Sequence, residues 1–318
     1  MIVSQTSNDK STSSSLFTVV VALVANGLLA LAKSVAAAVT GSAAMVAEAA
    51  HSWSDTGNEV FLLLAERRGK RPRDASHPRG YGRSTFIWSL VAAFGLFSAG
   101  AMVSIWHGVT ELFAEPGKAA FTANYIVLGI AFVFEGTSFF QATRQVRGKA
   151  SRFGLRPLRF VTRTSDSTLR AVFFEDSAAL IGLVLAAVGI GLHQLTGHHE
   201  YDALGSIAVG LLLAAVAVFL MRRNMQYLLG EGDSADVRAS VLGRMLEHPD
   251  IDRVTYLHLE YVGPQRLFVV AAVDLTGDDR EPDLAVRIRQ VEADIEENEL
   301  IEDAVLTLSL PEDAALTV

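Results

Sequence analysis

The stretch "AAHSWSDTGNE", residues 49–59, carries the polar side chains that the fold has to accommodate. It lies within the otherwise apolar segment 42–65 and places His51, Asp55 and Glu59 at intervals of four residues. This spacing stacks the three side chains on one face of a helix. In a membrane-spanning helix such a stripe is costly, because charged side chains in hydrocarbon need partners. The stretch therefore predicts a functional site inside a membrane helix.

Long apolar segments recur through the first 230 residues. The chain has 318 residues, half of them hydrophobic, and its mean hydropathy is +0.32. A helix needs about 20 predominantly apolar residues to cross a bilayer. The candidates are residues 16–39, 42–65, 84–110, 121–141, 171–195 and 203–221. We therefore predict an all-α membrane domain of six helices over residues 16–230.

The first fifteen residues are polar and lack the basic start and the cleavage site of a signal peptide. We expect residues 1–15 to form a disordered tail and the segment 16–39 to remain as the first membrane helix. The sequence contains no phosphate-binding loop of the G-x-x-x-x-G-K-[ST] type.

Positive charge is concentrated in two connections between the predicted helices. Residues 66–83 hold seven of the 27 Lys and Arg, and residues 143–170 hold eight, whereas 40–44 and 193–202 hold none. Short basic loops remain in the cytoplasm. Six spans then place both termini in the cytoplasm, and we expect the membrane to be a bacterial inner membrane.

The C-terminal segment 231–318 has a different composition, with 21 Asp and Glu against seven Arg and no apolar span. Its patterns predict, in order, a helix, two strands, a helix and a strand, over 234–247, 254–262, 266–275, 282–297 and 304–310. This order indicates a small cytosolic α+β domain of ferredoxin-like type. Its core is modest, which favours a homodimer, and its acidity argues against nucleic acid binding.

Ligands for a metal ion are limited, because the chain has no cysteine. Imidazole, carboxylate, carbonyl and water remain. A neutral His51 and an ionised Asp55 one turn apart form half of a site for a divalent cation, and Asp176 is the expected partner from another helix. For the other acids at this depth, helix packing or contact with the membrane surface is an equal alternative.

Three motifs together resemble the cation diffusion facilitator family of metal–proton antiporters. They are "TGSAAMVAEAAHSWSDTGNE" at 40–59, "HPRGYGR" at 77–83 and "FEDSAALIG" at 174–182. The Glu-Asp pair in the third resembles one branch of that family. The resemblance extends over nearly the whole chain, with its six helices, its basic loop and its α+β tail.

The resemblance implies a transport site with two ligands from the second helix, His51 and Asp55, and two from the fifth, at positions 172 and 176. The chain keeps Asp176 but has Val172 at the other position, which cannot bind a metal. Three protein ligands and a water suit zinc. The alternatives for a fourth ligand or a proton carrier are Glu175, Glu135 and Asn26.

Other polar clusters predict weaker sites. In the loop, Asp74 and His77 match a zinc site of some family members, but the third position is Tyr81, so we favour a structured basic loop. The tail has only His248 and His258, too few to favour a regulatory metal. The outer connection "GHHE", residues 197–200, is either a solvated loop or a loose capture site for metal.

The function that follows is efflux of a divalent metal, with zinc as the expected substrate, in exchange for protons that compete for His51. We expect no enzyme activity and no catalytic cofactor. One alternative is a membrane receptor or assembly partner that does not transport metal, for which Val172 is the main argument. Another is a transporter of iron, cobalt or manganese.

Overall fold

A computed structural model describes residues 8–114, 121–152, 154–230 and 235–317. These residues divide into two compact units. The first comprises residues 1–64, 88–161 and 168–222, and the second comprises 65–87, 162–167 and 223–318. The second unit therefore contains the acidic tail together with short segments from the basic connections.

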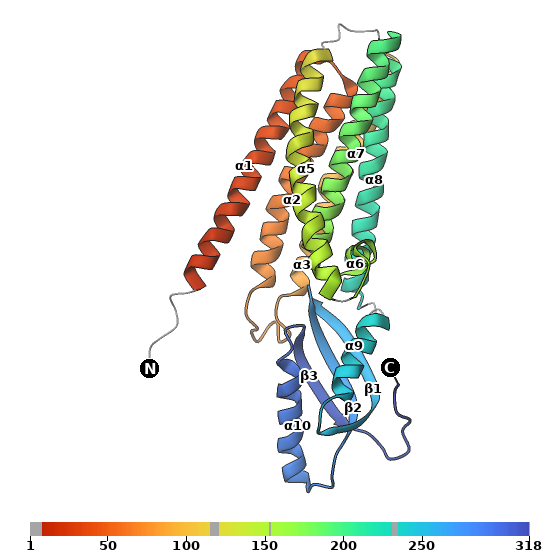
Figure 1. The fold of residues 1–318 in the computed structure, drawn as a ribbon. Coiled ribbons are helices and arrows are strands. Elements are labelled where there is room, and N and C mark those ends of the chain that lie inside the picture. Colours follow the sequence, from red (N-terminus) through yellow and green to blue (C-terminus); the bar gives the residue numbers. More distant parts are fainter. Residues whose placement is uncertain (1–7, 115–120, 153, 231–234, 318) are drawn as a thin grey trace. The chain divides into compact units, whose positions relative to one another are not determined.

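Long helices make up the first unit and run alongside one another (Figure 1). The bounds of these and the shorter helices are α1 (Asn8–Thr40), α2 (Ala43–Gly69), α3 (Arg83–Ala92), α4 (Ser98–Glu111), α5 (Phe121–Arg152), α6 (Pro157–Arg163), α7 (Ser167–Thr196) and α8 (Glu200–Leu228). A π-helical turn, η1 (Ala93–Phe97), joins α3 to α4. Helix α1 begins at Asn8, so residues 8–15 of the expected disordered tail are helical, and residues 1–7 lie outside the described residues.

Within the described residues, five helical segments are long and apolar enough to cross a membrane. They are Leu23–Thr40, Arg83–Glu111, Phe121–Ser151, Ser167–Thr196 and Glu200–Leu228. Helix α2 is not among these five, because Glu48, Asp55 and Glu59 interrupt its apolar stretch. The protein thus has a helical membrane domain with five apolar helices, and α2 is the polar helix beside them.

Glycines let two of these helices approach closely. A Cβ at Gly210 of α8 would lie 3.0 Å from the carbonyl oxygen of Ala101, and one at Gly108 of α4 would lie 2.8 Å from that of Ala203. Only the absence of a side chain permits such contacts, which are typical of packing between membrane helices. Helices α4 and α8 are therefore packed backbone against backbone at these two positions.

The N-terminal end of α2 is held by a residue of α8. The buried carboxylate of Asp202 accepts hydrogen bonds from the Ser42 hydroxyl (2.9 Å) and from the backbone N–H groups of Ala43 (2.8 Å) and Ala44 (3.3 Å). The first N–H groups of a helix have no partner within the helix. Asp202 therefore caps α2 from a neighbouring helix.

The second unit contains a three-stranded sheet formed by β1 (Ile251–Gly263), β2 (Arg266–Leu275) and β3 (Ile301–Leu308). Their order is β1-β2-β3, with β1 antiparallel and β3 parallel to β2. Helices α9 (Ala235–Leu246) and α10 (Glu281–Glu296) complete the expected order of elements. Alternate residues of β2 are buried and share a core with both helices. The expectation of a small C-terminal α+β domain is confirmed at this level.

The loop between α2 and α3 belongs to the same unit as the sheet. Arg79 and Arg83 both pair with Glu260 of β1, and Arg73 pairs with Glu302 and Asp303 of β3. A Cβ at Gly82 would lie 2.5 Å from the carbonyl oxygen of Val262, and the close contact therefore requires glycine. Basic charge in the loop thus meets acidic charge on the sheet.

Candidate metal site in the membrane helices

Two of the expected ligands lie together on α2. Nε2 of His51 is 3.4 Å from Oδ2 of Asp55, as the spacing of four residues predicts. His51 is 1% exposed, and neither of its ring nitrogens has a hydrogen-bond partner among the described residues. Oδ1 of Asp55 is also buried without a partner there. Buried polar atoms are normally satisfied, so this cluster of free lone pairs is suited to a cation.

Asp176, the expected partner on α7, has a different contact. Its Oδ2 accepts a hydrogen bond of 2.8 Å from the hydroxyl of Ser138 on α5. Among the residues that the structure describes, no three or more His, Asp and Glu side chains are close enough together to hold one ion. The arrangement of His51, Asp55 and Asp176 around a metal therefore stays a prediction.

The acid of α7 that does contact α2 is Glu175. Its carboxylate accepts a hydrogen bond from the side-chain amide of Asn58, one turn beyond Asp55. Val172 packs against an apolar cluster that includes Ala47, Leu213 and Leu220. Position 172 is thus part of the hydrocarbon core of the unit, and α7 offers α2 a carboxylate at 175.

The remaining candidates are Asn26 on α1 and Glu135 on α5. The amide of Asn26 on α1 donates a hydrogen bond of 2.7 Å to Glu59, two turns beyond His51 on α2. Glu135 of α5 is half-buried and interacts electrostatically with Lys33 and Glu48. Asn26 is therefore hydrogen-bonded at the far end of the polar stripe, whereas Glu135 interacts electrostatically with Asp55 and Asp176 as well as with Lys33.

A buried ion pair between α1 and α2 was not predicted from the sequence. Nζ of Lys33 lies 3.0 Å from Oε2 of Glu48, and both residues are fully buried. Lys33 precedes Gly41 by eight residues and Glu48 follows it by seven, so the two sit at the same depth of the helical hairpin. That symmetry about the turn is the sequence signal that identifies the pair.

The loop residues Asp74 and His77 form a turn. One carboxylate oxygen of Asp74 accepts hydrogen bonds from the backbone and hydroxyl of Ser76 and from the N–H of His77, and the other accepts one from the Tyr81 hydroxyl. The hydrogen bonds from Ser76 and Tyr81 hold the pKa of the Asp74 carboxyl below its usual range. The ring of His77 stacks on that of Tyr81 with centroids 3.9 Å apart. These contacts favour the structured-loop interpretation.

The tail histidines have ordinary surroundings. Nε2 of His248 lies 3.3 Å from a carboxylate oxygen of Asp294, and His258 is exposed on β1.

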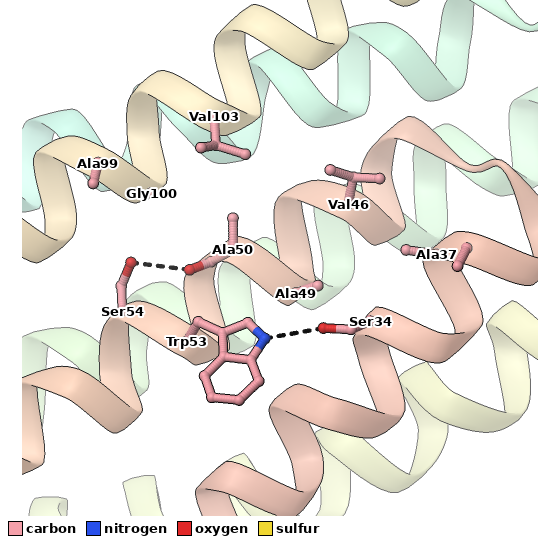
Figure 2. A pocket seen from close by; sticks show the side chains of 11 residues that line it. Ser34, Ala37, Val46, Ala49, Ala50, Trp53, Ser54, Ala99, Gly100 and Val103 are labelled. Atoms are coloured by element: carbon pink, nitrogen blue, oxygen red, sulfur yellow. Dashed lines mark hydrogen bonds between the residues drawn. The ribbon is translucent and has the colours of Figure 1, made fainter.

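A hollow of about 580 Å³ in the first unit is apolar. Figure 2 shows small side chains around it, with Trp53 donating a hydrogen bond to Ser34. The membrane acids do not line this hollow, so it is not the candidate metal site.

The five apolar helices and the buried imidazole–carboxylate pair define a membrane protein with a polar centre suited to a cation. Residues 19–229 match the model of a protein family described as the cation efflux transmembrane domain. The chain therefore belongs to the cation diffusion facilitator family, as the motifs predicted.

Several relatives of known name support this assignment. The chain is 34% identical over 259 residues to the mitochondrial proton-coupled zinc antiporter SLC30A9 of Xenopus laevis, covering 81% of this chain and 46% of that protein. It is 33% identical to metal tolerance protein C4 of Arabidopsis thaliana, covering 75% and 52%. It is 23% identical to the cation efflux system protein CzcD of Alcaligenes sp., covering 86% and 81%. The chain thus spans about half the length of the first two of these relatives. The family consists of transporters and not of enzymes.

Proposed function

We propose that this protein exports a divalent metal cation, zinc, in exchange for protons. The observation that carries the proposal is the pair of His51 and Asp55 on α2, 3.4 Å apart, in which the imidazole is buried and neither of its nitrogens makes a hydrogen bond within the described chain. A mixture of imidazole and carboxylate suits zinc better than the oxygen-only sites of magnesium or manganese. The names of the SLC30A9 relatives, which include zinc and proton coupling, support the same conclusion.

The ligands that we assign are His51, Asp55 and Asp176, with water at the fourth position. Oδ2 of Asp176 accepts the hydrogen bond from the hydroxyl of Ser138, and we assign the other oxygen of this carboxylate to the metal. Glu175 remains the alternative fourth ligand, because it already faces α2 through Asn58. Glu135, which interacts electrostatically with Asp55, and Asn26 are the further alternatives.

Proton coupling follows from the chemistry of the ligands. A metal binds the deprotonated imidazole and carboxylate, so protons and metal compete for the same lone pairs. A proton gradient directed inward then loads the site with protons on the outside and releases them inside. Histidine is suited to this exchange because its ordinary pKa is near neutral.

We further propose that α2 crosses the membrane as the sixth span, with its polar stripe facing the other helices. The domains are then the membrane part, 16–230, and a ferredoxin-like cytosolic part, 231–318. Both termini lie in the cytoplasm of a bacterial inner membrane, and the protein forms a homodimer. Sedimentation of the detergent-solubilised protein tests the dimer, and a monomer at every metal concentration contradicts it.

The decisive experiment is zinc uptake into proteoliposomes under a pH gradient. Asp55→Ala and Asp176→Ala are expected to abolish uptake, and Glu66→Ala, an exposed acid near the end of the same helix, is the matched control. Glu175→Gln preserves the hydrogen bond with Asn58 and is expected to retain uptake within about threefold. Full zinc uptake by Asp176→Ala would mean that the transport site lies elsewhere. Loss in Glu175→Gln would make Glu175 the fourth ligand or the proton carrier.

A further inference from the structure

A small cavity of about 50 Å³ lies in the first unit, among the ends of helices at the side opposite to the basic connections. The walls come from the turn between α1 and α2, the end of α4, the start of α5, the end of α7 and the start of α8. The polar side chains in these walls include Glu111, Asn124, His193, His199 and Asp202. This is room for one ion with a water molecule.

Two buried acceptor atoms in this cavity have no hydrogen-bond partner within the described part of the chain. Asn124 is 2% exposed, and its Oδ1 is unpartnered. Nε2 of His199 is also buried and unpartnered, while Nδ1 of the same ring lies 3.8 Å from a carboxylate oxygen of Glu200. When the proton of this imidazole is on Nδ1, Nε2 offers its lone pair to the cavity. Oδ1 of Asn124 and Nε2 of His199 would therefore be satisfied by a cation or by a hydrogen-bond donor.

His193 supplies a second imidazole from the last turn of α7. The edge of the Phe121 ring contacts it, with centroids 5.2 Å apart and planes at 85°, so the orientation of the imidazole is restricted. Asp202 also lines the cavity, but its two oxygens accept the hydrogen bonds that cap α2. We therefore assign Asp202 to the structure of the wall and not to ligand binding.

We propose that this cavity is a second, weak binding site for a divalent transition metal, held by His199, His193 and Oδ1 of Asn124, with water completing the shell. Imidazole ligands favour zinc or cobalt over magnesium or calcium. The described residues present no group of three imidazole and carboxylate ligands here, so the protein ligands that we assign are two imidazoles and one amide oxygen. The inference rests on the proposed function, in which this end of the bundle is where the metal leaves.

Metal binding to the purified full chain tests this site separately from transport. In an Asp55→Ala background, which removes the central site, equilibrium dialysis with Co²⁺ or Zn²⁺ is expected to show one weak site. Adding His193→Gln and His199→Gln should weaken its binding by at least tenfold. His198→Gln is the matched control, because that imidazole is 68% exposed and does not line the cavity.

Unchanged binding after both substitutions would overturn the proposal and assign the two acceptors to water. Gel filtration and circular dichroism establish that each variant is folded, and His199→Ala alone gives the same test if the double variant is unstable. Absence of zinc uptake by the unaltered protein would contradict the transport function but leave this binding result intact. Normal uptake with no histidine-dependent binding would contradict the second site alone.

Discussion

Nζ of Lys33 on α1 lies 3.0 Å from Oε2 of Glu48 on α2, and both side chains are fully buried. Removing two charges from water is costly, and each charge is tolerated because the other compensates it. Glu48 precedes His51 by one turn of the same helix, so a compensated ion pair lies one turn from the candidate metal site.

Lys33→Met is expected to destabilise the protein by about 3 kcal/mol, because it leaves Glu48 buried without a counter-charge. Glu48→Gln should have a similar effect for the opposite reason. The double variant Lys33→Met with Glu48→Leu should recover most of the stability, since no charge remains unpaired. Thermal unfolding in detergent measures all three. If the double variant lost as much stability as the two single variants together, the two residues would not be coupled.

His51→Asp is expected to lower the preference for zinc over manganese by about tenfold or more, because the imidazole is replaced by an oxygen ligand. Competition between the two metals in vesicle uptake measures the ratio. His258→Asp on the exposed face of β1 is a control for the substitution itself. An unaltered ratio in His51→Asp would mean that the imidazole does not select the metal.

Gly82→Ala is expected to destabilise the second unit by about 1–3 kcal/mol. The added methyl group would lie 2.5 Å from the carbonyl oxygen of Val262 and 2.9 Å from Cα of Gly263, and both are backbone atoms that cannot rotate away. Gly148→Ala is the matched control, because nothing lies within 4 Å of its added Cβ and alanine favours the helix. Hydrogen exchange of β1 measures the effect, and equal protection in both variants would contradict it.

The loop around Asp74 is expected to keep its conformation from pH 5 to pH 8. Hydrogen bonds from Ser76 and Tyr81 lower the pKa of Asp74 in the folded protein, so its contribution is present above the unfolded pKa of about 4 and is lost only as pH falls through the lower folded value. Asp74→Asn should increase tryptic cleavage in the loop over this whole range and leave zinc uptake within twofold. A large loss of zinc uptake in Asp74→Asn would instead favour the interpretation of the loop as a metal site.

The parts of the fold that were predicted from the sequence are those fixed by local pattern. Apolar length indicated the five apolar helices, alternation indicated β1 and β2, and the spacing of four residues brought His51 and Asp55 together. The rotation of α7 was not predictable, because that helix is apolar on all sides and its pattern does not identify the face toward α2. For this reason the contact of Glu175 with Asn58 and that of Asp176 with Ser138 emerged only from the packed helices.

The cap that Asp202 forms on α2 also has a mechanical consequence. A tilt of α2 that preserves these hydrogen bonds has its pivot at Ala43. His51 lies eight residues from that pivot, roughly 12 Å, and Glu59 lies sixteen residues away, roughly 24 Å. The same tilt therefore moves Glu59 about twice as far as His51. In the transport function that we propose, such a tilt opens the end of the bundle at Glu59, while an ion bound at His51 shifts comparatively little.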